Sequence, residues 1–143
     1  MAIDVTVTNT IARPPEAVAA YLADPRNDPE WIGGLVEVVP PSGPIAAGTQ
    51  VKRIAKFMGR RIHYVLEVEH HEPGRLLRMR SVEAPFPMRV TYEVTPADGG
   101  SRVALRVEGG PGGLARLVHP LMAIEVGRNL RGDLRRLRAR LER

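Results

Sequence analysis

Between residues 34 and 109 the chain alternates apolar and polar side chains in six short stretches, separated by turn sequences rich in Gly, Pro, Ser or Asp. This two-residue alternation is typical of strands with one buried face, and connections this short join antiparallel neighbours. An earlier stretch alternates in the same way, which brings the total to seven. The predicted strands are residues 3–11, 35–39, 49–58, 61–70, 75–83, 88–95 and 102–108. They are expected to form one antiparallel sheet.

One long helix is predicted after the sheet. Pro120 is expected to begin it, because proline suits a first turn, where its missing N–H costs nothing. Two smaller elements are expected between the first two strands: a helix from about Pro14 to Ala23, and a short helical turn or loop from Pro25 to Trp31. The long helix is identified by apolar residues that recur every three or four positions, namely Met122, Val126, Leu130, Leu134, Leu137 and Leu141.

A hollow interior follows from the widths of these elements. Seven strands about 4.8 Å apart make a sheet roughly 30 Å wide, whereas one helix with its side chains is about 10 Å across. The sheet must therefore curl around the helix, and misfits in that curl leave room for a small ligand. The alternative is a packed core that binds nothing. The length of 143 residues fits a single domain, residues 1–143.

Composition narrows the class of protein. Cysteine is absent, so disulfides and thiolate chemistry are excluded. The acidic start at Asp4 argues against a signal peptide, and no apolar run is long enough for a membrane span, so a cytoplasmic protein is expected. His70 and His71 should point to opposite faces of a strand, so no metal site is expected. Motifs for dinucleotides or phosphates are missing, and no cofactor is predicted.

The net charge of +5 comes from the end of the chain. Residues 1–110 carry 13 basic and 13 acidic side chains, whereas residues 111–143 carry eight arginines and three acidic side chains. Arg128, Arg131, Arg135 and Arg138 form a stripe on the predicted helix. The stripe is either a solvated helix face or a docking surface for an anionic partner. With only six aromatic residues for base stacking, nucleic acid binding is not expected.

Several short sequences in a fixed order resemble a known family. They are residues 11–18 (IARPPEAV), 24–31 (DPRNDPEW), 48–51 (GTQV), 72–77 (EPGRLL), 99–103 (GGSRV) and 133–137 (DLRRL). Their order and spacing resemble the START-like superfamily, and more closely its bacterial polyketide cyclase/dehydrase-type branch, often called SRPBCC proteins. The resemblance implies an α+β helix-grip fold like that of the birch pollen allergen, with a seven-stranded curved antiparallel sheet around a long C-terminal helix. It also implies a cavity for an apolar or polycyclic molecule, and it carries over no catalytic residue.

Polar side chains on apolar faces are the candidate ligand contacts. Glu125, Asn129 and Asp133 flank the helical stripe, and either they face the interior or they pair with nearby arginines at its edge. Arg53 interrupts an apolar strand face. It is either a buried cation that needs Glu125, Asp133 or a ligand carboxylate as its partner, or a residue at a bulge or strand edge. The predicted contacts are Trp31, Arg53, Phe57, Tyr64, Met79, Tyr92, Met122, Glu125, Val126, Asn129 and Asp133.

Three functions are compatible with this pattern. The first is binding of a small hydrophobic or polycyclic ligand, lipid or polyketide-like, between the sheet and the last helix. The second is a polyketide cyclase or dehydratase that acts in the same cavity. The third is an interaction module that uses the basic helix. The oligomeric state is expected to be monomer or homodimer.

Overall fold

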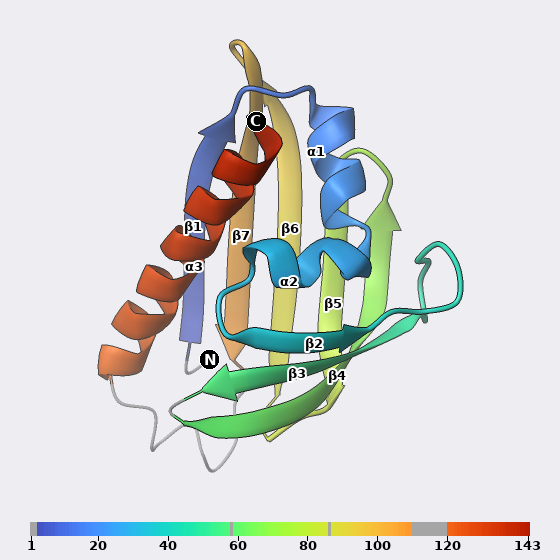
Figure 1. The fold of residues 1–143 in the computed structure, drawn as a ribbon, viewed down its shortest axis with the longest axis vertical. Helices are drawn as coiled ribbons and strands as arrows, with labels where there is room; N and C mark the ends of the chain where they lie inside the picture. Colours follow the sequence, from blue (N-terminus) through green and yellow to red (C-terminus); the bar gives the residue numbers. More distant parts are fainter. Residues whose placement is uncertain (1–2, 58, 86, 110–119) are drawn as a thin grey trace.

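A computed structural model of the chain describes residues 3–57, 59–85, 87–109 and 120–143. The strands run in the order β1-β7-β6-β5-β4-β3-β2 and are antiparallel throughout (Figure 1). Every predicted strand is present, and the boundaries differ by at most a few residues. The strands are β1 Ile3–Ile11, β2 Leu35–Val39, β3 Gln50–Phe57, β4 Arg60–Glu72, β5 Leu76–Glu83, β6 Met88–Ala97 and β7 Gly100–Gly109.

The helices also lie where the sequence predicts them. Helix α1 spans Pro15–Leu22, and α3 spans Pro120–Leu141 with proline in its first turn. The segment that ends at Trp31 forms a 3-10 turn, η1 Pro25–Asn27, followed by a single α-helical turn, α2 Asp28–Trp31. Of the two possibilities left open for this segment, the helical turn is the one that forms. No helix among the described residues is both long and apolar enough to cross a membrane.

The sheet curls, and the helices cover its concave face. Strands β2, β3 and β4 turn across the others at the lower end of the view in Figure 1. Helix α3 contacts β1, whereas α1 contacts β6 and β7. The short helix α2 contacts both α3 and β2. Three helices therefore share the concave face, which one helix is too narrow to cover.

Strand β4 pairs irregularly with β5, and its register shifts between Val65 and Leu66 and again between Val68 and His70. The alternation along β4 nevertheless holds, because Leu66 and Val68 both belong to the core cluster. Val65, between them, is buried but does not belong to that cluster. His63 is exposed.

One end of the concave face is closely packed. Ile11 at the end of β1, Val103 near the start of β7 and Leu137 in the last turns of α3 are at most 1% exposed. Polar contacts fix this end: Arg13 Nη1 donates to the carbonyl of Leu141 at 3.0 Å, and the N–H of Ala12 donates to Glu142 Oε2 at 2.8 Å. We call this the closed end.

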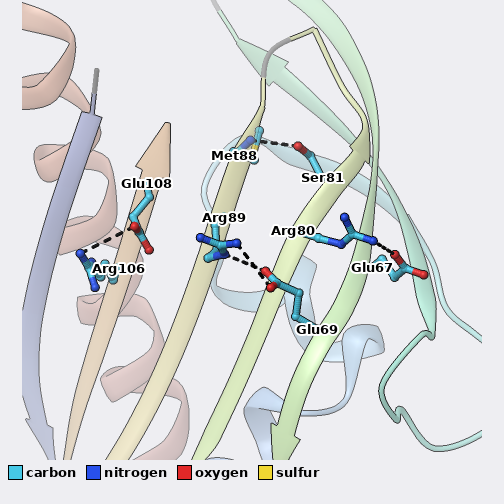
Figure 2. A network of polar contacts seen from close by, with 8 residues as sticks. All are labelled: Glu67, Glu69, Arg80, Ser81, Met88, Arg89, Arg106 and Glu108. Carbon is cyan, nitrogen blue, oxygen red and sulfur yellow. Dashed lines mark hydrogen bonds and ion pairs between the residues drawn. The ribbon is translucent and has the colours of Figure 1, made fainter. Parts of the chain in front are cut away.

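The convex face carries ion pairs between adjacent strands and across one intervening strand. Figure 2 shows Arg80 on β5 with Glu67 on β4, 2.9 Å apart, and Arg89 on β6 with Glu69 on β4, 2.7 Å apart. All four side chains are at least partly exposed. Exposed ion pairs contribute little to stability, so these pairs are consistent with an ordinary solvated sheet face.

Candidate functional site

The end of the concave face opposite the closed end is less covered by the residues that the structure describes. Val5 on β1 lies directly opposite Val107 on β7, and both are half-buried against the core. Met88 at the start of β6 and Leu130 of α3 are half-buried in the same way. We call this the open end. Inward-facing apolar side chains here keep part of their surface accessible, which is what a binding site for an apolar ligand requires.

Arg53 of β3 is a buried cation on the concave face. Its side chain is about 5% exposed, and Nη2 donates a hydrogen bond to Oδ2 of Asp28 at 2.6 Å. Asp28, the first residue of α2, is about 2% exposed. Of the two possibilities left open for Arg53, the buried cation is the one that the structure shows. Neither Glu125 nor Asp133 is its partner, because α2 brings Asp28 to Arg53, whereas Glu125 pairs with Arg128 and Asp133 with Gly33 and Arg136.

Two aromatic side chains complete the surroundings of this ion pair. Nη2 of Arg53 also donates to the hydroxyl of Tyr92 at 3.3 Å. The Trp31 and Tyr92 rings meet edge to face, with centroids 5.6 Å apart and planes at 69°. Asp28, Trp31, Arg53 and Tyr92 form what we call the buried polar cluster. Tyr64 lies opposite Arg53 in the β3–β4 pairing and is half-buried beside the cluster.

The buried polar cluster leaves hydrogen-bonding capacity unused. Among the described residues, three buried side-chain atoms have no hydrogen-bond partner: Asp28 Oδ1, Trp31 Nε1 and Arg53 Nε. All three belong to this cluster. Buried polar atoms are nearly always paired in native proteins, with protein, water or ligand, because an unpaired one costs about 1–3 kcal/mol. The cluster is therefore the position in the interior best suited to a polar group from outside the chain.

Burial sets the protonation states of the cluster. It raises the pKa of Tyr92 to about 12, so the phenol keeps its proton at neutral pH. For Arg53, burial disfavours the charge, but Tyr92 and Asp28 outweigh this effect and hold the guanidinium pKa well above its ordinary value. Burial raises the pKa of the Asp28 carboxyl, although Arg53 acts to lower it. Arg53 therefore stays cationic, and the 2.6 Å separation of Nη2 and Asp28 Oδ2 is that of an ion pair.

Helix α3 holds α2 in place through Asp133. One oxygen of this carboxylate, Oδ1, accepts from the N–H of Gly33 at 2.9 Å and also from the Arg136 guanidinium. Arg136 Nε in turn donates to the carbonyl of Trp31 at 3.0 Å. Burial raises the pKa of Asp133, and the Gly33 and Arg136 contacts oppose that rise. Asp133 thus positions Trp31 through the backbone, as the prediction of pairing with nearby arginines anticipates.

Comparison with known proteins places this arrangement in a family. A family model described as polyketide cyclase / dehydrase and lipid transport matches residues 2–142. The chain belongs to this family. Among proteins with curated descriptions, none matches the sequence.

Solved structures share the fold of this polyketide cyclase/dehydrase family member. Protein CV1439 from Chromobacterium violaceum has a TM-score of 0.79 at 20% identity, over 100% of this chain and 99% of that one. A START superfamily protein from Mycobacterium smegmatis has a TM-score of 0.75 at 15% identity, covering 97% of each chain. The structure named Ara h 8.0201 has a TM-score of 0.74 at 15% identity, covering 96% of each chain. The predicted helix-grip fold is confirmed.

The fold of this family member does not gather all of the predicted contacts. Glu125 and Asn129 are exposed, and Glu125 pairs with Arg128 at 3.4 Å. The hypothesis that these two side chains face the interior is wrong, because α3 turns about 100° per residue and both lie too far round from its buried stripe. Met79 is buried and Val126 is half-buried. The side chains of Phe57 and Met122 lie outside the described residues, and their part in a chamber between the sheet and α3 stays a prediction.

Sequence reasoning missed Asp28. Asp28 and Pro29 form the second of two Asp-Pro pairs in this segment. Asp-Pro pairs are typical of loops, and their carboxylates usually cap a turn. One signal could have identified it. Asp28 and Trp31 are three residues apart, so in a helical turn they lie on the same side, and a buried Trp31 brings Asp28 towards the interior.

The third hypothesis concerned the arginine stripe on α3. Arg128, Arg131, Arg135 and Arg138 are all exposed. Arg138 pairs with Glu142 at 3.2 Å, and Arg128 pairs with Glu125. These pairs within one helix favour the solvated-face interpretation of the stripe.

A separate hollow of about 730 Å³ lies between α1, the β2–β3 connection and the β4–β5 turn. Small side chains such as Ala19 and Ala20 line one wall, and Pro40, Pro44 and Ile45 line the other. None of the predicted ligand contacts lines it. Its position depends on the path of the connection between β2 and β3, which strand periodicity does not specify.

Proposed function

We propose that this protein binds a small, mostly apolar molecule on the concave face of its sheet, with the apolar body at the open end and a polar group at the buried polar cluster. The observation that carries the proposal is the uneven burial along α3. Leu137 is fully buried, whereas Leu130, two turns earlier on the same stripe, is half-buried. A sheet and helix that only packed against each other would bury both.

The lining agrees with an apolar ligand. Val5, Val107, Met88 and Leu130 offer aliphatic and thioether surface at the open end, with Tyr64 as an amphipathic wall beside the cluster. Sites for small molecules commonly combine such a lining with a few well-placed polar groups. The description of the family as polyketide cyclase, dehydrase and lipid transport points to the same chemical class of ligand.

The first experiment is native mass spectrometry of the protein purified from its own host, followed by extraction of whatever co-purifies. A small apolar compound at near-stoichiometric amount is the expected result. Repeated purification without such a compound, together with no binding of added apolar probes, would contradict the proposal.

Filling the open end should block binding. Leu130→Trp adds a large ring where the apolar body is expected to lie, so affinity for the co-purified compound should fall about tenfold or more, the effect of losing about 1.4 kcal/mol. The matched control is Ile124→Trp on the same helix, where the native side chain is 55% exposed. Isothermal titration calorimetry measures both variants, and circular dichroism checks that α3 is intact. Equal affinity of the two variants would place the ligand elsewhere.

A second candidate is a cyclase or dehydratase that acts at the same position. One observation favours it: the Asp28 carboxylate and the Tyr92 hydroxyl, a proton acceptor and a proton donor, lie on the same Arg53 Nη2 atom. General acid–base chemistry on a carbonyl compound needs such a pair. Incubation of the co-purified compound with fresh protein separates the two functions, because only an enzyme converts it to a product.

A further inference from the structure

The unused hydrogen-bonding atoms of the buried polar cluster limit what the ligand can be, given the proposed function. Asp28 and Arg53 form a single contact, from Nη2 to Oδ2, where an arginine and a carboxylate can form two parallel ones. The atoms left over are Asp28 Oδ1, an acceptor, and Arg53 Nε–H, a donor. A group that bridges them must accept one hydrogen bond and donate another.

A third unused atom lies on the same helical turn. Trp31 Nε1–H is a donor without a partner, and Trp31 itself is 1% exposed. Trp31 follows Asp28 by three residues in α2, and its ring touches Tyr92, which shares Arg53 with Asp28. The cluster therefore offers two donors and one acceptor to an incoming group.

The charges of Arg53 and Asp28 further restrict which ligand group can bind at the buried polar cluster. Asp28 already neutralises Arg53 across 2.6 Å, and the two side chains are only about 2% and 5% exposed. A ligand carboxylate would bring a second negative charge close to Asp28 and could not donate to Oδ1, and a buried unpaired charge is strongly disfavoured. A hydroxyl, in contrast, donates once and accepts up to twice, and it matches the three atoms without adding charge.

We propose that the ligand is a neutral hydroxyl compound, a phenol, enol or alcohol on an apolar body, whose hydroxyl donates to Asp28 Oδ1 and accepts from Arg53 Nε and Trp31 Nε1. The ion pair acts as a neutral recognition element, and an acidic ligand is excluded.

Three matched probes test this inference by calorimetry: 2-naphthol, 2-methoxynaphthalene, which cannot donate, and 2-naphthoate, which is anionic at neutral pH. We expect 2-naphthol to bind about tenfold or more tightly than either of the others, since one unmatched buried partner costs about that factor. Equal affinity for 2-naphthol and 2-methoxynaphthalene would overturn the inference and leave the proposed function intact. Tightest binding of 2-naphthoate would overturn it as well, and no binding of any probe would contradict both proposals.

A conservative variant tests whether Trp31 Nε1 contacts the ligand oxygen. Trp31→Phe keeps an aromatic ring and removes Nε1–H, so it should reduce the affinity for 2-naphthol and for 2-methoxynaphthalene alike, because both oxygens can accept from that atom. The preference for the hydroxyl, which depends on Asp28 Oδ1, should persist. Arg106→Gln on the convex face is the control and should change neither. An unchanged affinity in Trp31→Phe would exclude Trp31 from the site, and a crystal structure with only an ordered water on these three atoms at saturating 2-naphthol would overturn the inference.

Discussion

Replacing Arg53 with methionine is expected to lower the free energy of unfolding by about 3–5 kcal/mol, because the substitution leaves the buried Asp28 carboxylate without its partner. Domains of this size are stable by roughly 5–15 kcal/mol, so a large part of the total would be lost. Asp28 is about 2% exposed, so its carboxylate has little contact with solvent. Urea denaturation followed by circular dichroism measures the change.

The double variant Arg53→Met with Asp28→Leu is the matched control for this prediction. Removing both charges removes the unpaired one, and buried ion pairs replaced by apolar residues of similar volume are often neutral for stability. Most of the lost stability should therefore return. A loss below about 1 kcal/mol in Arg53→Met alone would mean that water reaches the pair and that the cluster is not buried.

The second large effect is expected for Leu137→Ala, which should cost about 2–5 kcal/mol of unfolding free energy. Leu137 is fully buried at the closed end, where α3 is tied to the turn after β1. Leu130→Ala, on the same stripe but at the open end, should cost only about 1 kcal/mol, because less apolar surface is buried there. The comparison of the two variants isolates the difference between the ends, since the residue types and the helix are the same.

Thermal and urea denaturation of both variants check the comparison. Similar losses for Leu130→Ala and Leu137→Ala would show that α3 packs equally along its length. The open end would then be as full as the closed end, and the proposed binding position would have no room.

The periodicity of apolar residues predicted the strands and helices, because this pattern depends only on residues that are close in the sequence. Alternation along β3 placed Arg53 on the apolar face of the strand but left open whether it was a buried cation or a residue at a bulge or strand edge. The register shifts between β4 and β5 were not predictable in this way, because they concern how two strands pair and leave the alternation within β4 unchanged.

The contact partner of a side chain was harder to predict than the strand or helix face on which it lies. Asp28 and Arg53 are 25 residues apart and meet only because α2 folds onto the concave face. Asp133 was expected near the interior and is buried, yet its contacts are Gly33 and Arg136. Which of two plausible carboxylates reaches a buried arginine depends on how helices cross the sheet, and local sequence does not contain that information.

The most direct test of interior binding uses the lone tryptophan. Trp31 contributes the only indole N–H of the chain, so its resonance in a ¹H–¹⁵N NMR spectrum is assigned without ambiguity. Titration with 2-naphthol should shift this resonance in a saturable manner, in step with the affinity measured by calorimetry, because the ligand oxygen accepts from Nε1. An indole resonance that stays in place while calorimetry reports binding would show that the ligand lies elsewhere.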